Sequence, residues 1–294
     1  MSELTMQTPL QFLTGAGGVP LAVDYYGPED GAPVILLHGG GQTRHAWGAT
    51  ARRLGAEGYR VLSLDLRGHG DSGWSAQGEY GFSAFRDDVR AVLDLVGRPA
   101  VLVGASLGGI ASLMAAGEGA QADGKGDERI RALVLVDITP KVAGPGSERI
   151  MAFMTANPEG FADVEEAADA VAGYLPHRPR PRDPSGLMKN LRLRGERLHW
   201  HWDPSFIRRA APERFDDDGR LAAAARNVTA PTLLVRGEES EVVRPEDVDG
   251  FLALMPQAEV VDVHGAGHMV AGDRNTIFGD AVVAYLLRVA PPSR

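Results

Sequence analysis

The chain has 294 residues, no cysteine and a formal net charge of −9. Its length allows one large α/β domain or a domain with an insertion, and the missing cysteines exclude disulfides, thiolate nucleophiles and cysteine-based metal sites. The acidic charge disfavours a general nucleic-acid binder, and the sequence shows neither a signal-peptide pattern nor an apolar run long enough to cross a bilayer, so we expect a cytoplasmic protein with no nucleic-acid or membrane partner.

The first half of the chain alternates strand-like and helix-like runs. Strand-like runs at 10–13 and 21–25 flank a glycine cluster and predict a hairpin-like start. The continuous apolar run at 34–37 predicts a strand that is covered on both faces, as in a parallel sheet. There follow in order a helix at 47–57, a strand at 59–66, a helix at 83–96, a strand at 101–103, a helix at 110–116 and a strand at 130–136.

The rhythm changes between residues 139 and 226. Strand-like runs are absent there, prolines cluster, and apolar residues recur at helical spacing. The alternation then resumes with a strand at 232–235, a helix at 245–254, a strand at 259–263 and a helix at 275–287.

This pattern predicts an α/β fold, in which a mostly parallel sheet is flanked by helices. The irregular segment predicts a helical lid, inserted between two late strands and lying over the carboxyl edge of the sheet, where open α/β sheets bind ligands. We therefore expect a core of residues 1–138 and 227–294 and a lid of residues 139–226 that includes a return helix to the core.

A Gly104-x-Ser106-x-Gly108 motif joins the central strand to its helix. A side chain at either glycine would collide across so tight a turn, and the serine between them is forced into a strained backbone conformation. The turn points the Ser106 hydroxyl out at the carboxyl end of the sheet, beside a helix N-terminus that favours negative charge. An ordinary glycine-rich turn with a capping serine would have the same local sequence, so the rest of the chain has to decide between the two.

Further motifs occur along the chain in a fixed order. They are His38-Gly39-Gly40, Arg67-Gly68-His69-Gly70-Asp71-Ser72, Gly104-x-Ser106-x-Gly108, Gly237-x-x-Ser240-Glu241 and Gly265-Ala266-Gly267-His268. With these motifs the chain resembles the α/β-hydrolase superfamily, in its serine-nucleophile, esterase- and lipase-like branch, over nearly its whole length. In that family the nucleophile, the acid and the histidine follow one another in this chain order.

The resemblance implies a catalytic triad. Ser106 matches the nucleophile and His268 the base, with His264 ranked well below it. Glu241 matches the acid, although aspartate is commoner at that position and Glu238 and Glu239 lie close by. Asp137, at the end of the preceding strand, is a second route to the acid that some relatives use.

The resemblance also implies an oxyanion hole formed by the backbone N–H groups of Gly40 and Leu107, for which Gly41 is an alternative to Gly40. We expect a substrate pocket that includes Gly41, Trp47, Trp200, Trp202 and Met269, while core packing of Trp200 and Trp202 is equally compatible with the sequence.

No metal or other cofactor is expected. His199 and His201 have the spacing of a ligand pair but lack a third ligand in register, and the glycine-rich loop after residue 37 lacks a phosphate-binding pattern. Seven basic residues of the lid either attract a substrate carboxylate or, as we prefer, pair with acidic neighbours on the surface; they are Arg178, Arg180, Arg182, Lys189, Arg192, Arg194 and Arg197.

The sequence therefore predicts a serine hydrolase that acts on a small to medium carboxylic ester or a related acyl compound, through an acyl-enzyme. A lactonase, an amidase, a carbon–carbon bond hydrolase and a cofactor-free perhydrolase would use the same triad. A non-catalytic small-molecule receptor is the alternative from another class. The sequence does not decide the natural substrate or the oligomeric state.

Overall fold

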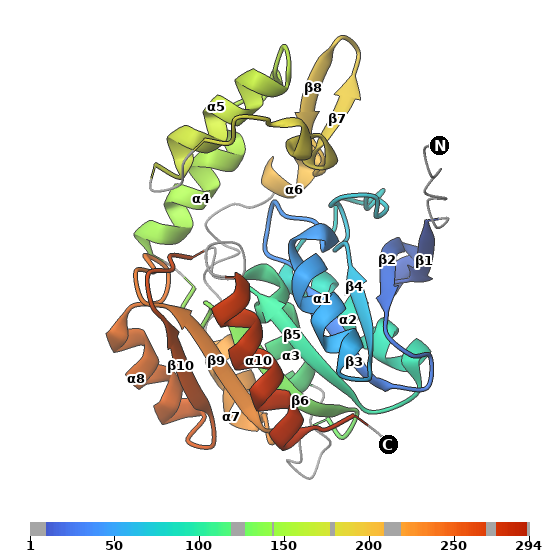
Figure 1. Ribbon diagram of the computed structural model, residues 1–294, viewed down its shortest axis with the longest axis vertical. Coiled ribbons are helices and arrows are strands. Elements are labelled where there is room, and N and C mark those ends of the chain that lie inside the picture. The colour runs from blue at the N-terminus through green and yellow to red at the C-terminus, as the bar shows by residue number, and fades with distance from the viewer. Residues whose placement is uncertain are drawn as a thin grey trace.

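The computed structural model describes residues 10–118, 127–142, 144–176, 180–208, 219–268 and 275–292. Within these residues one large sheet of eight strands forms the centre of the protein (Figure 1). Its strands, in chain order, are β1 (Gln11–Thr14), β2 (Pro20–Tyr26), β3 (Ala32–Leu37), β4 (Tyr59–Leu64), β5 (Ala100–Ala105), β6 (Ile130–Val136), β9 (Thr232–Gly237) and β10 (Glu259–Val263).

The spatial order of the strands is β1-β2-β4-β3-β5-β6-β9-β10. The strands from β4 to β10 run parallel, and β1 and β2 form the antiparallel start that the glycine-separated runs predict. The expectation of a mostly parallel α/β sheet is confirmed.

Helices cover both faces of the sheet because the central strands are apolar on both faces. In β3, Ile35 and Leu37 belong to one core cluster, whereas Val34 and Leu36 belong to the other. The first cluster is completed by α2 (Phe82–Val96), α3 (Leu107–Glu118), α7 (Arg220–Asn227) and α8 (Pro245–Leu254). The second is completed by α1 (Gly48–Ala56) and α10 (Asn275–Val289).

The segment between β6 and β9 lies mostly beyond the carboxyl ends of the parallel strands, at the top of Figure 1. It contains α4 (Pro145–Thr155), α5 (Val164–Tyr174), the short η3 (Ser185–Asn190), β7 (Leu191–Arg194), β8 (Arg197–Trp200) and α6 (Pro204–Arg208). We call the part from α4 to α6 the lid. The division into a core of residues 1–138 and 227–294 and a lid of residues 139–226 stays a prediction.

The expectation that this segment has no strands is wrong, because β7 and β8 pair as an antiparallel hairpin. Leucine and arginine alternate in β7, and Gly195 in the two-residue turn adopts a φ of 61°, which glycine tolerates without strain. One further short helix, η1 (Ala16–Gly18), precedes β2, and another, η2 (Arg44–Trp47), precedes α1. In the described parts of the chain, no helix combines the length and apolarity that crossing a bilayer requires.

The return helix α7 packs closely against α3, the helix that begins beside Ser106. Gly117 makes this approach possible, because a Cβ atom at that position would overlap the backbone carbonyl of Ala224 in α7. The contact therefore joins the end of the inserted segment to the helix of the central turn.

We expect Gly117→Ala to destabilise the protein by about 1–3 kcal/mol, the usual cost of overpacking a tight interface. Gly173→Ala is the matched control, because Gly173 lies in α5 with no atom within 4 Å of the added Cβ and is free of a left-handed φ. Urea unfolding of the two variants and of wild type measures the difference. Equal unfolding midpoints for Gly117→Ala and wild type would show that α7 is not held at this contact.

Candidate active site

Ser106 occupies a strained turn between β5 and α3. Its φ of 45° lies in the left-handed region, which costs a residue with a Cβ about 1–2 kcal/mol. The two flanking glycines are required by space: a Cβ at Gly104 would overlap the backbone of Gly108, and a Cβ at Gly108 would overlap the backbone of Leu37. The sterically enforced turn expected from the sequence is therefore present.

His268 lies in the loop after β10 and is held by a carboxylate. Its Nδ1 donates a hydrogen bond of 2.7 Å to Oδ2 of Asp137, which is completely buried. The other carboxylate oxygen of Asp137 accepts the backbone N–H of Gly237 at 2.9 Å, and the Ser240 hydroxyl donates to Oδ2. Since an ionised carboxylate only accepts hydrogen bonds, this arrangement places the histidine proton on Nδ1 and leaves Nε2 as the basic nitrogen.

The structure corrects the preference for Glu241 as the partner of His268. The Glu241 carboxylate accepts two hydrogen bonds from Nη1 of Arg149, at 2.7 and 2.9 Å, and is 60% exposed. The loop after β9 contributes Ser240 instead, whose hydroxyl donates a hydrogen bond to Asp137, the carboxylate that holds His268. The second route considered from the sequence, through Asp137, is the one that the geometry supports.

The lower-ranked histidine lies apart from this arrangement. His264 is 91% exposed and pairs with Glu238 on the surface. Glu239 lies beside Glu241 and likewise makes no described contact with His268.

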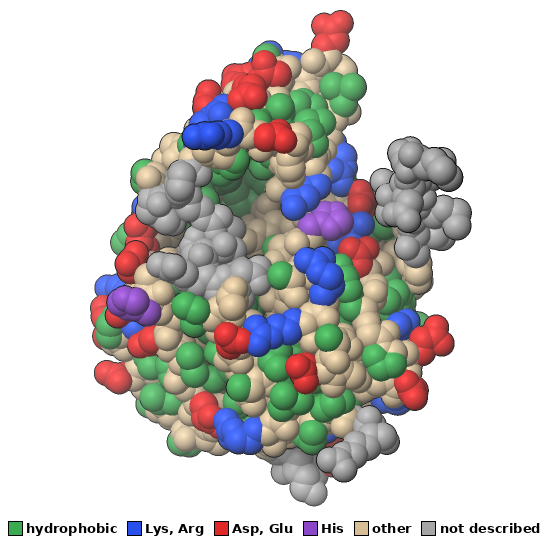
Figure 2. Space-filling model, in the orientation of Figure 1, with side chains coloured by type: hydrophobic (Ala, Val, Ile, Leu, Met, Phe, Trp, Pro, Cys, Tyr) green, Lys and Arg blue, Asp and Glu red, His purple; other side chains and the backbone are tan. Residues whose placement is uncertain are grey.

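Ser106 and His268 line the same cavity, which has a volume of about 350 Å³. It lies between the lid and the carboxyl edge of the sheet, where Figure 2 shows the molecule hollowed with hydrophobic side chains in the hollow. Among the described residues that line it there is no aspartate, glutamate, lysine or arginine. The apolar and aromatic lining comes from Trp47, Tyr80, Phe82, Ile110, Ile138, Val142, Ile150, Met151, Phe153, Met154, Tyr174, Phe206 and Val242.

Two of the predicted pocket residues line the cavity and two do not. Gly41 and Trp47 line the cavity, whereas Trp200 and Trp202 are not among its lining residues. The two tryptophan rings stack on each other at 5.2 Å, with Trp200 edge-on to Phe161, so the core-packing alternative describes them. Met269 lies outside the described residues. Sequence reasoning missed the lid aromatics such as Phe153, because their helical spacing is that of any amphipathic helix.

Gly40 and Leu107 both line the cavity beside Ser106. Leu107 is the first residue of α3, so its N–H has no partner within the helix. Among the described residues, neither the Leu107 N–H nor the Gly40 N–H has a hydrogen-bond acceptor. Two free donors next to the serine fit an oxyanion hole, and that role stays a prediction.

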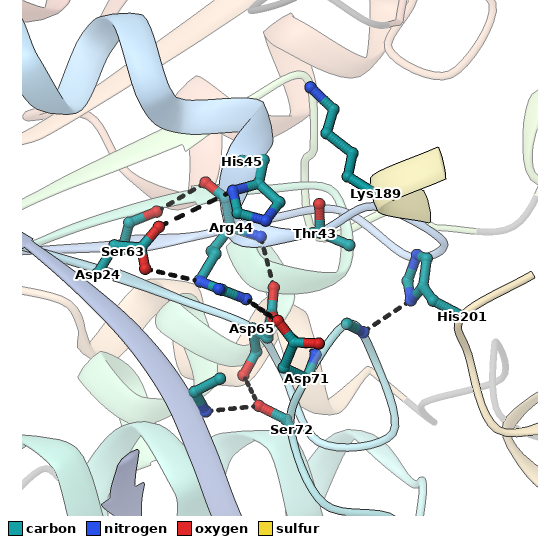
Figure 3. A network of polar contacts seen from close by, with 12 residues as sticks. Asp24, Thr43, Arg44, His45, Ser63, Asp65, Asp71, Ser72, Lys189 and His201 are labelled. Carbon is teal, nitrogen blue, oxygen red and sulfur yellow. Dashed lines mark hydrogen bonds and ion pairs between the residues drawn. The ribbon is translucent and has the colours of Figure 1, made fainter. Parts of the chain in front are cut away.

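A lid histidine, His201, is bonded to the loop that carries Gly40. Its Nδ1 accepts the backbone N–H of Gly70 at 2.7 Å, and its Nε2 donates to the carbonyl of Gly41 at 3.2 Å. Figure 3 shows the His201 ring turned toward the loop of Asp71 and Ser72, to which Gly70 belongs. His201 therefore has a hydrogen-bonding role in holding two loops of the core, which its spacing from His199 did not indicate.

An ion-pair network around the buried Arg44 and Asp65 lies next to the loop that carries Gly40 (Figure 3). Arg44 is 6% exposed and pairs with three carboxylates, those of Asp24, Asp65 and Asp71. Arg192 of β7 pairs with the second oxygen of Asp71 at 2.6 Å and so extends the network into the lid. Buried charges need such mutual pairing because each has lost its hydration.

Three basic residues of the lid pair with carboxylates in the described part of the chain. Arg180 pairs with Glu165 and Asp169, and Arg192 pairs with Asp71. Arg197 approaches Glu166 at 3.7 Å. Surface pairing, the preferred interpretation of the basic segment, describes Arg180 and Arg197, whereas Arg192 pairs with a half-buried carboxylate of the core. Arg178 lies outside the described residues.

Three buried histidines form a row from the core to the lid. The ring centroids of His38 and His69 are 5.2 Å apart, and those of His69 and His201 are 5.8 Å apart. Burial lowers the pKa of His38 to about 4 and that of His69 to about 3, and it lowers the pKa of His201 well below its usual value. All three rings are therefore neutral at neutral pH, as the hydrogen bonds of His38 and His201 require.

Comparison with known proteins agrees with this geometry. The residue profile described as "Alpha/beta hydrolase family" matches residues 34–281. The chain is 29% identical over 262 residues to the sn-1-specific diacylglycerol lipase ABHD11 of Mus musculus, covering 86% of this chain and 80% of that protein. It is 31% identical over 253 residues to the esterase Rv0045c of Mycobacterium tuberculosis, covering 82% of this chain and 78% of that protein.

A solved structure extends the similarity to three dimensions. The crystal structure of E-2-(acetamidomethylene)succinate hydrolase superposes with a TM-score of 0.81 at 25% identity, covering 94% of this chain and 98% of that one. The proteins that the chain resembles are thus named for different activities, as a lipase, an esterase and a hydrolase of a succinate derivative.

We expect the histidine row to make the protein sensitive to acid. Below about pH 6.5 these histidines become protonated in the unfolded chain but stay neutral in the folded protein, because burial lowers their pKa. The free energy of unfolding therefore falls as the pH drops toward 4, by up to about 1.4 kcal/mol per pH unit for each histidine. Above that range both states are neutral and the histidines contribute no pH dependence. Urea unfolding from about pH 7.5 to about pH 4.5 measures this slope.

His201→Gln keeps a donor and an acceptor but removes one titrating ring, so we expect a shallower slope than in wild type. His264→Gln, at an exposed position, is the matched control and should keep the wild-type slope. A wild-type slope that His201→Gln leaves unaltered would contradict the assignment of the acid sensitivity to this row.

Proposed function

The chain belongs to the α/β-hydrolase family, and from this premise we propose that it is a serine hydrolase of the carboxylesterase type, acting on a carboxylic ester of small to medium size. The observation that carries the proposal is the hydrogen bond between Asp137 and His268 at the rim of a cavity that Ser106 also lines. A serine hydroxyl becomes nucleophilic when a neighbouring base takes its proton, and a buried carboxylate orients that base.

In the proposed mechanism, Nε2 of His268 takes the Ser106 proton as Oγ attacks the ester carbonyl carbon. The oxyanion that forms is stabilised by the N–H groups of Leu107 and Gly40, each of which is worth about 10²–10³ in turnover at comparable sites. His268 then gives the proton to the leaving oxygen, and the C–O bond breaks. Water, deprotonated by His268, hydrolyses the acyl-enzyme and restores Ser106.

The lining of the main cavity supports an uncharged acyl group. No aspartate, glutamate, lysine or arginine is found among its described lining residues, and a carboxylate buried there would lose its hydration without gaining an ion pair with lysine or arginine. Each methylene of an acyl chain that enters such a surface gains about 0.8 kcal/mol. The similar proteins are named as a lipase, an esterase and a hydrolase of a succinate derivative. The choice of an uncharged ester as substrate is therefore our proposal from the lining of the cavity.

We expect wild type to hydrolyse p-nitrophenyl esters, with kcat/KM rising from acetate to butyrate because the apolar cavity binds the added methylenes. Ser106→Ala should lower kcat at least about a thousandfold. Ser185→Ala, at an exposed lid serine that does not line the cavity, is the matched control and should keep the wild-type rate. Turnover that survives in Ser106→Ala would rule out the mechanism; binding of an ester without any wild-type turnover would favour a receptor.

A second prediction separates the two carboxylates. Asp137→Asn should lower kcat/KM for p-nitrophenyl butyrate by about 10³–10⁴, because the amide cannot hold the correct histidine tautomer. Asparagine tolerates the positive φ of 49° at this position, so the fold should survive. Glu241→Gln leaves the Asp137–His268 hydrogen bond intact and should cause a far smaller loss.

Unfolding midpoints of both variants, measured in parallel, show whether any loss of rate comes from loss of structure. A greater loss in Glu241→Gln than in Asp137→Asn would return the role of the acid to Glu241.

A further inference from the structure

A second cavity of about 170 Å³ adjoins the main one. The two share the side chains of Ile150, Tyr174, Val242 and His268 as common walls. The second cavity lies between α4 and the end of α5 on the lid side and the loops after β9 and β10 on the core side. His268 is thus the one member of the proposed triad that lines both spaces.

The two cavities differ in chemistry. The main cavity has no arginine, lysine, aspartate or glutamate among its described lining residues, whereas Arg149, Glu239 and Glu241 line the second one. A ligand that spans both spaces would therefore have an apolar part near Ser106 and a charged or polar part near Arg149.

Arg149 presents its guanidinium in a geometry suited to a carboxylate. Its Nη1 donates to both oxygens of Glu241, and its Nη2 donates to the Tyr174 carbonyl at 2.9 Å. The guanidinium also lies over the Tyr174 ring, 5.7 Å from its centroid. Contacts to Tyr174 fix the side chain independently of Glu241, so that another carboxylate can take the place of the Glu241 carboxylate.

The ion pair with Glu241 is easily exchanged. Arg149 is 44% exposed and Glu241 is 60% exposed, and ion pairs in such surroundings contribute only about 0–1 kcal/mol. A substrate carboxylate would compete well against the exposed Glu241, because binding of the rest of the substrate already places it next to the guanidinium.

The positions of Ser106 and His268 assign each cavity to one half of the substrate. Ser106, Gly40 and Leu107 line the main cavity, so the carbonyl that is attacked lies there, with its acyl chain in the apolar space. The leaving oxygen must lie beside Nε2 of His268, because this nitrogen delivers the proton as the C–O bond breaks. A leaving group that continues past His268 enters the second cavity.

We propose that the second cavity binds the leaving group and that Arg149 selects alcohols that carry a carboxylate, which replaces Glu241 on the guanidinium. The preferred substrate is then an ester with an apolar acyl chain and an anionic leaving alcohol. This inference rests on the proposed serine-hydrolase function, and it assigns Arg149 a role that the family motifs do not include.

The test uses two esters that differ in one group. Butyryl esters of 3-hydroxypropanoate and of 3-hydroxypropanamide have the same length, but only the first carries a negative charge. Wild type should hydrolyse the carboxylate ester with the higher kcat/KM. Arg149→Gln should lower kcat/KM for the carboxylate ester by about tenfold to a hundredfold, the range expected of one charge-assisted hydrogen bond, with much less effect on the amide ester.

Two further variants strengthen the assignment. Glu241→Gln should raise kcat/KM for the carboxylate ester, because it removes the internal competitor for Arg149. Arg149→Glu should invert the preference and favour the butyryl ester of 3-aminopropanol. Arg180→Gln, which alters another lid arginine paired with two carboxylates, is the matched control and should keep the wild-type ratio of the two esters.

An equal loss on both esters in Arg149→Gln would overturn the proposal, since it would make the ion pair a simple contact between lid and core. Absence of hydrolysis of both esters alongside normal, Ser106-dependent hydrolysis of p-nitrophenyl butyrate would also overturn it, while the proposed function would stand. Hydrolysis of p-nitrophenyl butyrate that persists in Ser106→Ala would instead be a failure of the proposed function.

Discussion

The site depends on the pairing of two neighbouring parallel strands, β5 and β6. Ala105 and Val136 are paired at the carboxyl ends of these strands. The residue that follows each strand, Ser106 after β5 and Asp137 after β6, turns out of the sheet with a positive φ. The Ser106 N–H donates to the Val136 carbonyl, and the Asp137 N–H donates to the Val235 carbonyl of β9. Because these are the positive-φ residues other than glycine in the described chain, the backbone strain is concentrated where two members of the proposed triad stand.

The lid is bonded to the loops that surround the nucleophile. His201 joins the carbonyl of Gly41 to the N–H of Gly70, and Arg192 extends the Arg44 network to β7. A shift of the lid would therefore break a hydrogen bond next to Gly40, which lines the cavity. The lid thus shapes the cavity with its aromatic side chains and also fixes the backbone of the proposed oxyanion loop. The neutrality of His201, a result of burial, is a condition for both of its hydrogen bonds.

Local patterns predicted the parts of this structure that local forces determine. The apolar runs gave the strands, and the glycines around Ser106 indicated a turn whose steric need the structure reproduces. The partner of His268 depends on which of two neighbouring strands, β6 or β9, is followed by a carboxylate that reaches the histidine, and a single sequence does not contain that arrangement in space. The hairpin β7–β8 had a signal, the alternation of leucine and arginine before Gly195, but its four-residue strands are too short to stand out among proline-rich helices. The cavity aromatics come from five separate segments, so only the folded chain brings them together.

The position of the acid has a consequence for the loop after β9. On the proposed mechanism, Asp137 supplies the carboxylate from β6, so this loop supports the triad through the Ser240 hydroxyl and the Gly237 N–H. Glu241 is then free to point outward, where it meets Arg149 of the lid. Had Glu241 supplied the acid, its carboxylate would be buried against His268, and Arg149 would lose the carboxylate with which it pairs. With the carboxylate supplied by β6, the proposed triad is complete, and the charged contact between Arg149 and Glu241 remains beside His268, the residue proposed to protonate the leaving group.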